Sequence, residues 1–318
     1  MIARHGIVLI ALLGFSQSAW GDAGEMARFE KEFPAAAKRQ EERFAKAKGS
    51  CRLLSTDPKG SKPTKIDKAE FAIDHGYEKV TIHREFGVGK GKVAHTDIVY
   101  CISEETAFNL TRLPGEKNFV VEGIGSTPSD EAAYLTSFGR FVKAHHCVLG
   151  RSMTRVMASP GFRVTNAERV EKDGRSLVKV DYESGSSEPK ERVSIVFDPQ
   201  WDWAIKSMEY IPGKFPMFRI TTEVEYGTPQ GGLVLPLRVT IRDQPGSSSV
   251  CEFVDWSFEP TPEAEFMMPF YGLPDLASKA SRSRGGMTYW LGGGALATLV
   301  AAIMFRRLST RGVSLARS

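Results

Sequence analysis

The stretch MFRITTEVEY, residues 217–226, alternates apolar and polar side chains with unusual regularity. Its apolar side chains share one face of an extended chain: Phe218, Ile220, Val224 and Tyr226. Charged or hydroxyl side chains lie between them, which suits a face in contact with water. A period of two residues is typical of a half-buried strand, so the stretch predicts an antiparallel sheet with one face on a core.

Similar short runs lie on both sides of this strand. Five precede the middle of the chain, at 68–73, 77–86, 96–102, 106–113 and 118–124, and six more accompany residues 217–226 after it, at 161–170, 176–184, 191–197, 203–210, 233–241 and 250–258. Helical patterns are predicted at 24–48, 127–145 and 152–158. The order predicts an α+β, mainly β fold: one curved antiparallel half-barrel of roughly 11–12 strands covered by helices.

The two ends carry membrane-related signals. Arg4, an apolar run and small residues at Ala19 and Gly21 predict a secretory signal peptide with cleavage after Gly21. Residues 287–305 contain no charge and, as a helix, would extend roughly 28 Å, which matches the hydrocarbon core of a bilayer. A transmembrane helix is therefore predicted there. A buried core helix, or a removable sorting tail after Gly285-Gly286, is the alternative.

These signals divide the chain into five expected regions: a signal peptide (1–21), an exported domain (22–273), a flexible linker (274–286), the transmembrane helix (287–305) and a short basic cytoplasmic tail (306–318). The expected product is a single-pass protein of the cytoplasmic membrane. Its main domain would lie on the periplasmic or other extracytoplasmic side, because the signal peptide exports it.

Charge argues against nucleic acid as a partner. The whole chain has a formal charge of +4, but without Arg4 and the four arginines of the predicted tail the charge is −1. Affinity for nucleic acid comes chiefly from neutralising phosphates, so a near-neutral domain is a poor candidate.

The cysteines all lie in the predicted exported region: Cys51, Cys101, Cys147 and Cys251. An even number in an oxidising compartment is consistent with up to two disulfides, and the sequence does not choose among the pairings. Buried thiols are the alternative. No pair has the Cys-x-x-Cys spacing of a redox or zinc site.

Catalytic motifs are not found in the sequence. The segment GVGKGK, residues 87–92, lacks the spacing of a phosphate-binding loop and joins two predicted strands. His145-His146-Cys147 is the local cluster of potential metal ligands, but adjacent residues near a helix end point about 100° apart and cannot easily share one ion. We therefore expect no enzyme activity, no catalytic residues, no metal and no cofactor.

The order of helix, strands, central helices and strands resembles that of the periplasmic lipoprotein carrier LolA and its relatives, the LppX-type lipid carriers and the RseB-type sensory domains. The resemblance rests on four segments: TAFNLTRL (106–113), MASPGFRVTNAERVEKDGRSLVKVDY (157–182), FDPQWDWAIKSMEY (197–210) and EVEYGTPQGGLVLPLRV (223–239). It implies a half-open barrel, lidded by helices, that holds a lipid or a lipoprotein acyl chain. The transmembrane helix departs from the family, whose carriers are soluble or anchored by an acyl group.

The apolar strand faces supply the candidate lining of this cavity: Val80, Ile82, Phe86, Trp203, Phe218, Ile220, Val224, Tyr226, Leu235 and Leu237. In FDPQWDWAIKSMEY we expect Trp201 in a turn and Trp203 at the start of a strand, with Ile205 on the face of Trp203 and Met208 and Tyr210 on the other. Hairpin packing is the favoured role of these rings, ahead of cavity lining or contact with a carbohydrate. An envelope sensor or scaffold that binds a protein partner is the alternative function.

Overall fold

A computed structural model of the chain describes residues 23–56, 65–87, 93–103, 106–126, 138–185, 188–229, 233–243 and 246–274. The chain divides into two compact units, Met1–Phe266 and Met267–Ser318. The first unit contains all described helices and strands except the short 3-10 helix η3 (Met268–Tyr271).

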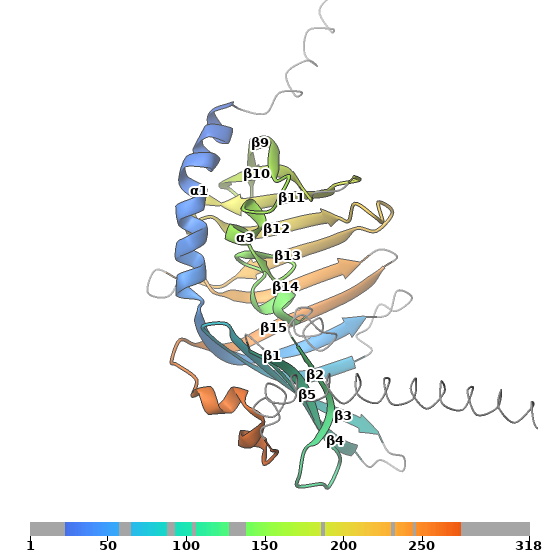
Figure 1. Cartoon of the computed structure of the whole chain (residues 1–318). Coiled ribbons are helices and arrows are strands. Elements are labelled where there is room, and N and C mark those ends of the chain that lie inside the picture. Colours follow the sequence, from blue (N-terminus) through green and yellow to red (C-terminus); the bar gives the residue numbers. More distant parts are fainter. Residues whose placement is uncertain are drawn as a thin grey trace, which may run out of the picture. The chain divides into compact units, whose positions relative to one another are not determined.

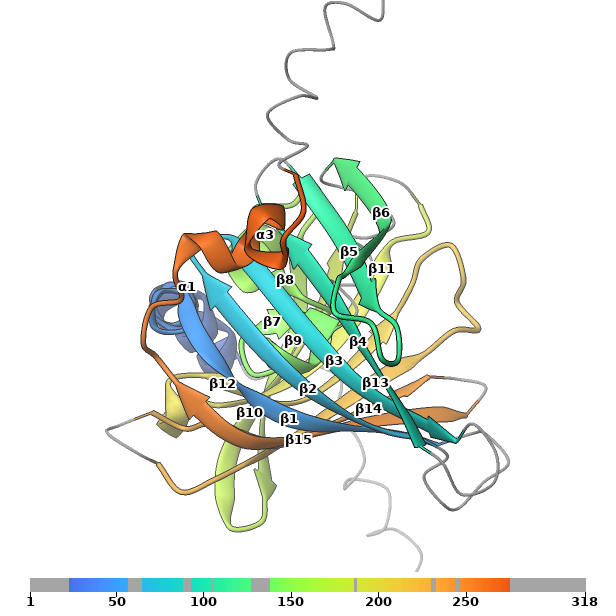
Figure 2. The same ribbon diagram turned by 90° about the horizontal axis from the view of Figure 1, so that it is seen from below.

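One antiparallel sheet of thirteen strands dominates the first unit, in the order β6-β5-β4-β3-β2-β1-β15-β14-β13-β12-β11-β10-β9 (Figures 1 and 2). The first meander comprises β1 (Lys46–Thr56), β2 (Lys65–Asp74), β3 (Tyr77–Gly87), β4 (Val93–Ile102), β5 (Thr106–Arg112) and β6 (Val120–Ser126). The second comprises β9 (Arg163–Lys172), β10 (Arg175–Ser184), β11 (Glu191–Asp198), β12 (Ala204–Ile211), β13 (Ile220–Tyr226), β14 (Pro236–Asp243) and β15 (Ser247–Ser257). The mainly β, open and curved sheet that the sequence predicts is confirmed.

The two meanders meet where β1 pairs with β15, which Figure 2 shows side by side. β1 is the strand that the sequence analysis missed, because its sequence KAKGSCRLLST does not alternate regularly between apolar and polar side chains. The bulge in this pair lies on β15, where Val254 is the extra residue opposite Ser50 and Cys51. Gly49 is needed there, since a Cβ atom at this position would lie 2.3 Å from the carbonyl oxygen of Asp255. The additional strand accounts for thirteen strands in the sheet where about twelve were expected.

Helix α1 (Ala23–Arg43) ends before the predicted boundary at residue 48, because β1 begins at Lys46. The helix runs crosswise to the strands of the second meander (Figure 1). Pro34 lies inside it. The predicted apolar stripe is confirmed for Phe29, Phe33 and Ala37, which are buried.

The connection between the meanders is described from residue 138, and residues 138–157 are called the middle segment here. It contains helical turns at 138–142, a small hairpin of β7 (Cys147–Val148) with β8 (Arg151–Ser152), and α3 (Met153–Met157). The predicted short helix near residues 152–158 is thereby confirmed, and the Ser152 hydroxyl caps it by accepting a hydrogen bond from the Arg155 amide. Two further 3-10 turns are η1 (Pro199–Trp201) and η2 (Glu263–Phe266).

Several sequence expectations fall outside the described residues. These are the signal peptide (1–21), most of the linker (274–286), the transmembrane helix (287–305) and the basic tail (306–318). Within the described ranges, no helix combines the length and the apolar character needed to cross a bilayer.

Candidate functional site

The sheet has an inner face, on which the apolar side chains of both meanders gather, and an outer face. The inner side chains form two clusters. We call the inner face of β9–β12 the closed half and the inner face of β13–β15 and β1–β4 the open half. The middle segment crosses from one to the other, because Phe138 and Val142 belong to the cluster of the open half and Val148 and Met153 to that of the closed half.

The closed half is filled by aromatic rings from α1. Phe29 and Phe33 stack on each other with ring centroids 4.6 Å apart, and Phe33 lies 4.7 Å from the Phe197 ring of β11. Trp203 packs edge-on against both α1 rings. All four rings are at most 5% exposed. This half is therefore a packed core.

Charged groups hold α1 in place over the closed half. Arg39 and Arg43 both donate to the carboxylate of Asp202, at 2.5 and 2.9 Å, beside the turn η1. This partner raises the pKa of Arg39. At the other end of the helix, Arg169 of β9 donates to the buried carboxylate of Glu25 at 2.5 Å. Both contacts join segments that lie far apart in the sequence.

The open half is apolar but less completely covered. Its fully buried side chains include Val80, Ile82 and Phe71 of the first meander. Other inner-face apolar side chains are only partly buried: Leu53, Ile73, Ile98, Tyr100, Ile102 and Phe141. The register places Ile98 opposite Ile82 and Tyr100 opposite Val80, so the partly buried side chains continue the core towards the edge of the sheet.

Polar groups occur at one end of the open half. Asp67 of β2 and Arg84 of β3 lie on the inner face, where Arg84 donates to the Asp67 carboxylate at 3.4 Å. Asp67 is 5% exposed. The Nε atom of Arg84 is buried and has no hydrogen-bond partner among the described residues. The site therefore combines an apolar floor with a buried donor.

The predicted cavity residues are distributed over both halves. Val80, Ile82 and Val224 are buried in the open half, Ile220 and Tyr226 are partly buried against it, and Trp203 belongs to the closed half. Leu235 is half-buried, whereas Phe218 and Leu237 are exposed. The side chain of Phe86 lies outside the described part. The sequence analysis did not select Ile98, Tyr100 and Ile102, although they alternate along β4 and pair with β3 on the inner face.

The segment with two tryptophans behaves as a hairpin. Trp201 lies in η1, where the Arg175 guanidinium stacks over its ring at 3.7 Å and Lys206 lies 5.1 Å away. Trp203, by contrast, has a left-handed backbone and points into the closed half, and β12 begins one residue later.

The expected alternation along β12 is wrong. Ile205, Met208 and Tyr210 all belong to the inner cluster, whereas we expected Met208 and Tyr210 on the opposite face. A bulge is the reason: Phe197 pairs with Ile205 but Val196 pairs with Ser207, so one extra residue resets the alternation.

His145, which is buried, and His146, which is half-buried, form a pair at the boundary between the halves. Their Nε2 and Nδ1 atoms lie 2.8 Å apart, and the rings contact Phe44. Burial lowers the pKa of His145 well below its usual value, and lowers that of His146 to about 3 with a contribution from the nearby charge of Lys143. Within the described ranges, no group of His, Cys, Asp and Glu side chains could hold a metal ion.

All four cysteines are buried thiols, so the predicted disulfides are not supported. Cys51 and Cys251 are in hydrogen-bond contact across the β1–β15 junction, and burial raises the pKa of Cys251 well above its usual value. Burial also raises the pKa of Cys147 to about 12. These thiols are therefore poor nucleophiles at neutral pH.

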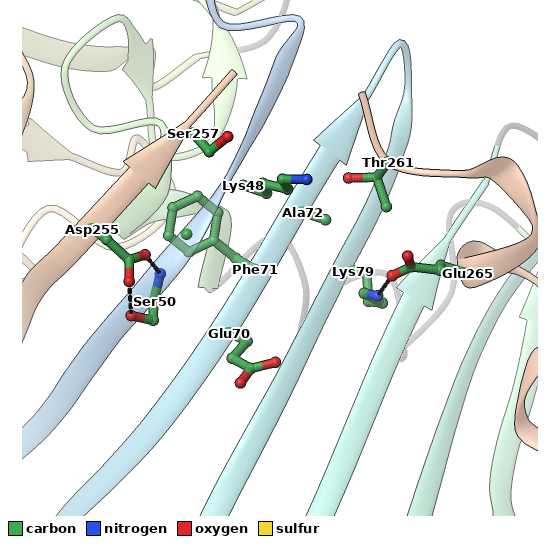
Figure 3. Close-up of a pocket in the computed structure, with 11 residues that line it drawn as sticks. Lys48, Ser50, Glu70, Phe71, Ala72, Lys79, Asp255, Ser257, Thr261 and Glu265 are labelled. Carbon is green, nitrogen blue, oxygen red and sulfur yellow. Dashed lines mark hydrogen bonds and ion pairs between the residues drawn. The ribbon is translucent and has the colours of Figure 1, made fainter. Parts of the chain in front are cut away.

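A cavity of about 380 Å³ lies mainly on the outer face of β15, β1, β2 and β3. Figure 3 shows its polar lining, in which Ser50 donates to the Asp255 carboxylate at 2.9 Å and Lys79 donates to Glu265 at 2.5 Å. Lys79 and Glu265 balance each other's charge, whereas the Asp255 carboxylate accepts from the neutral amide and hydroxyl of Ser50. The cavity is chemically unlike the apolar inner face, and its ion pairs suit a structural contact between η2 and the sheet.

The outer face also contains a histidine with a carboxylate at hydrogen-bond distance. His83 Nδ1 lies 2.7 Å from Asp97, whose other oxygen accepts from Arg112. These residues oppose one another on β3, β4 and β5. Burial acts to raise the pKa of Asp97, but the hydrogen bonds and charges of Arg112 and His83 together outweigh it and lower that pKa. The arrangement is a cross-strand charge ladder.

No protein-family model matches the chain, and neither does any curated protein. Solved structures do match. One is a domain assigned to outer membrane lipoprotein sorting from Vibrio parahaemolyticus, 11% identical, with a TM-score of 0.45 over 76% of this chain and 97% of that one. A LolA superfamily protein from Nitrosomonas europaea is 10% identical, with a TM-score of 0.43 over 75% of this chain and 99% of that one. With TM-scores below 0.5, neither match carries an argument about this chain, and function must follow from its own residues.

Proposed function

We propose that the open half binds the acyl chain of a lipid or lipoprotein, without catalysing a reaction. The observation that carries the proposal is the row of partly buried apolar side chains on the inner face, led by Ile98 and Tyr100 beside buried Ile82 and Val80. Apolar surface gains about 25 cal/mol per Å² when it leaves water, so such a row favours an apolar occupant.

The polar end of the open half suits the head of such a ligand. The buried Nε–H of Arg84 would donate to a carboxylate or phosphate oxygen there. A charge-assisted hydrogen bond at a buried donor is stronger than one between neutral groups, so Arg84 would fix the orientation of the ligand. A concave apolar site with few polar contacts is a common form of ligand site.

The cellular setting is part of the proposal and rests on the sequence. The signal peptide and the apolar residues 287–305 would place the domain on the extracytoplasmic side of the cytoplasmic membrane. A ligand with an acyl chain is abundant at that surface.

Uptake of a fluorescent fatty acid by the purified full chain tests the function. We expect saturable binding that falls about tenfold in Ile98→Gln, because a polar group there removes roughly one apolar side chain from the contact. Ile211→Gln is the matched control, since Ile211 is also half-buried but lies in the other half of the sheet. No uptake by the unmodified chain, or equal loss in both variants, would refute the proposal.

The second candidate is an envelope scaffold or sensor that binds a protein. The filled closed half favours it, because a ring-packed interior offers no room for a ligand. Chemical crosslinking in intact membranes distinguishes the two: a stoichiometric protein adduct supports the scaffold, and recovery of the chain with bound lipid supports the carrier.

A further inference from the structure

The loop between β12 and β13, PGKFPMFR at residues 212–219, exposes three large apolar side chains. Phe215 is 65% exposed, Met217 89% and Phe218 48%. Single exposed apolar side chains are common on protein surfaces, but three within four residues at a loop tip form a patch.

The loop has a defined conformation. The Phe215 amide donates to the Pro212 carbonyl at 3.2 Å, and the Phe218 amide donates to the Phe215 carbonyl at 2.8 Å. Gly213 packs so closely on the neighbouring hairpin that a Cβ atom would lie 1.8 Å from the Pro189 carbonyl oxygen. The apolar side chains are thus presented by a braced turn.

Shape and charge indicate the kind of partner. The loop lies at the ends of β12 and β13, where these strands leave the sheet (Figure 1). A projecting apolar tip needs a deformable apolar partner, and a bilayer supplies one. The loop also contains Lys214 and Arg219 and no carboxylate, although Arg219 lies 3.4 Å from Glu209 of β12. Cations beside an apolar tip suit a surface with anionic headgroups.

Exposed apolar side chains recur at the corresponding ends of β4, β5 and β6, near the other edge of the sheet. Val93 begins β4, and Leu113 and Val120 flank the β5–β6 turn; each is more than half exposed. The register places these positions and the β12–β13 loop at the same ends of the antiparallel strands.

We propose that the 212–219 loop inserts Phe215, Met217 and Phe218 into the headgroup region of an anionic phospholipid bilayer. The loop would thereby fix one end of the sheet at the membrane surface. This inference is independent of ligand binding in the open half, because the loop lies outside both inner clusters.

Photo-crosslinking tests the contact in the full chain. Met217 is replaced by benzoylphenylalanine, and the protein is irradiated in vesicles of phosphatidylethanolamine and phosphatidylglycerol. Val254, 63% exposed at the bulge in β15, receives the same replacement as the matched control. We expect the yield of phospholipid adducts at position 217 to be at least about tenfold higher than at position 254. The free energy of transferring one such side chain out of water corresponds to roughly a tenfold change in an equilibrium constant.

Two further variants sharpen the test. Phe215→Ser with Phe218→Ser should lower the adduct yield at 217 while leaving fatty-acid uptake unchanged, which separates this proposal from the ligand site. Lys214→Glu should lower the yield in vesicles that contain phosphatidylglycerol. Equal yields at 217 and 254, or adducts at 217 only to a second copy of the chain, would overturn the proposal.

Discussion

The two halves of the inner face are built from the same kind of strand but differ in what covers them. In the closed half, α1 adds Phe29 and Phe33 to the rings of Phe197 and Trp203. In the open half, the cover comes from residues 138–144 of the middle segment, and apolar side chains such as Ile98 remain partly exposed. The difference teaches that an apolar strand face does not itself make a binding site, because the covering element decides whether the side chains of that face are fully or only partly buried.

Removal of one ring from the closed half should have the largest effect. Phe33→Ala leaves a cavity between Phe29 and Phe197, and we expect the free energy of unfolding to fall by about 3–5 kcal/mol. Phe141→Ala in the open half should cost no more than about 2 kcal/mol, since that ring is only partly buried. Urea denaturation measures both. Equal losses would contradict the division into halves.

Acid should weaken the boundary between the halves. The pKa of His146 is about 3 in the folded protein, against 6.5 for an ordinary histidine, so below pH 6.5 the unfolded chain binds more protons. The contribution of neutral His146 to the free energy of unfolding is therefore fully present above pH 6.5 and decreases as the pH falls towards 3. The slope is about 1.4 kcal/mol per pH unit, or about 2 kcal/mol by pH 5 from this histidine.

His146→Gln is the variant that isolates this effect. Its unfolding free energy, measured at several pH values, should fall less steeply on acidification than that of the unmodified chain. An identical slope in both proteins would show that His146 is not the titrating group.

Loss of the buried Nε–H donor of Arg84 should weaken ligand binding in the open half and leave the packing of the closed half unchanged. Arg84→Met is expected to weaken binding of a long-chain fatty acid about tenfold, equivalent to about 1.4 kcal/mol, and to leave binding of the corresponding alcohol nearly unchanged. Arg52→Met, at an exposed site on β1, is the control. Titration calorimetry measures the affinities; equal weakening for acid and alcohol would exclude a headgroup role for Arg84.

The smallest effect is expected at the contact that holds α1. Asp202→Asn removes the charge that Arg39 and Arg43 share and retains a residue type that tolerates the left-handed backbone found there. Because these side chains are partly exposed, the loss should be about 1 kcal/mol or less. The loss should shrink at high salt, and a salt-independent loss would point to packing in place of charge.

The sequence determined the strands that alternate cleanly. The stretch 217–226 and its neighbours follow a period of two, which local backbone geometry imposes, and so they predicted a curved antiparallel sheet. The stripe of Phe29, Phe33 and Ala37 likewise predicted the buried face of α1.

The tertiary structure decided the features that the local pattern does not predict. These are the positions where a bulge interrupts the period of two and the contacts between segments far apart in the sequence. The bulge in β12 reversed the faces of Met208 and Tyr210, since one extra residue changes every later position. β1 was missed because its sequence does not alternate, and its pairing with β15 makes it a strand. The pairing of β1 with β15 joins residues about two hundred positions apart. The position of α1 over the closed half, and not over the open half, depends on packing between elements. The period of a strand is a property of neighbouring residues, whereas coverage of its face depends on contacts that the local pattern does not contain.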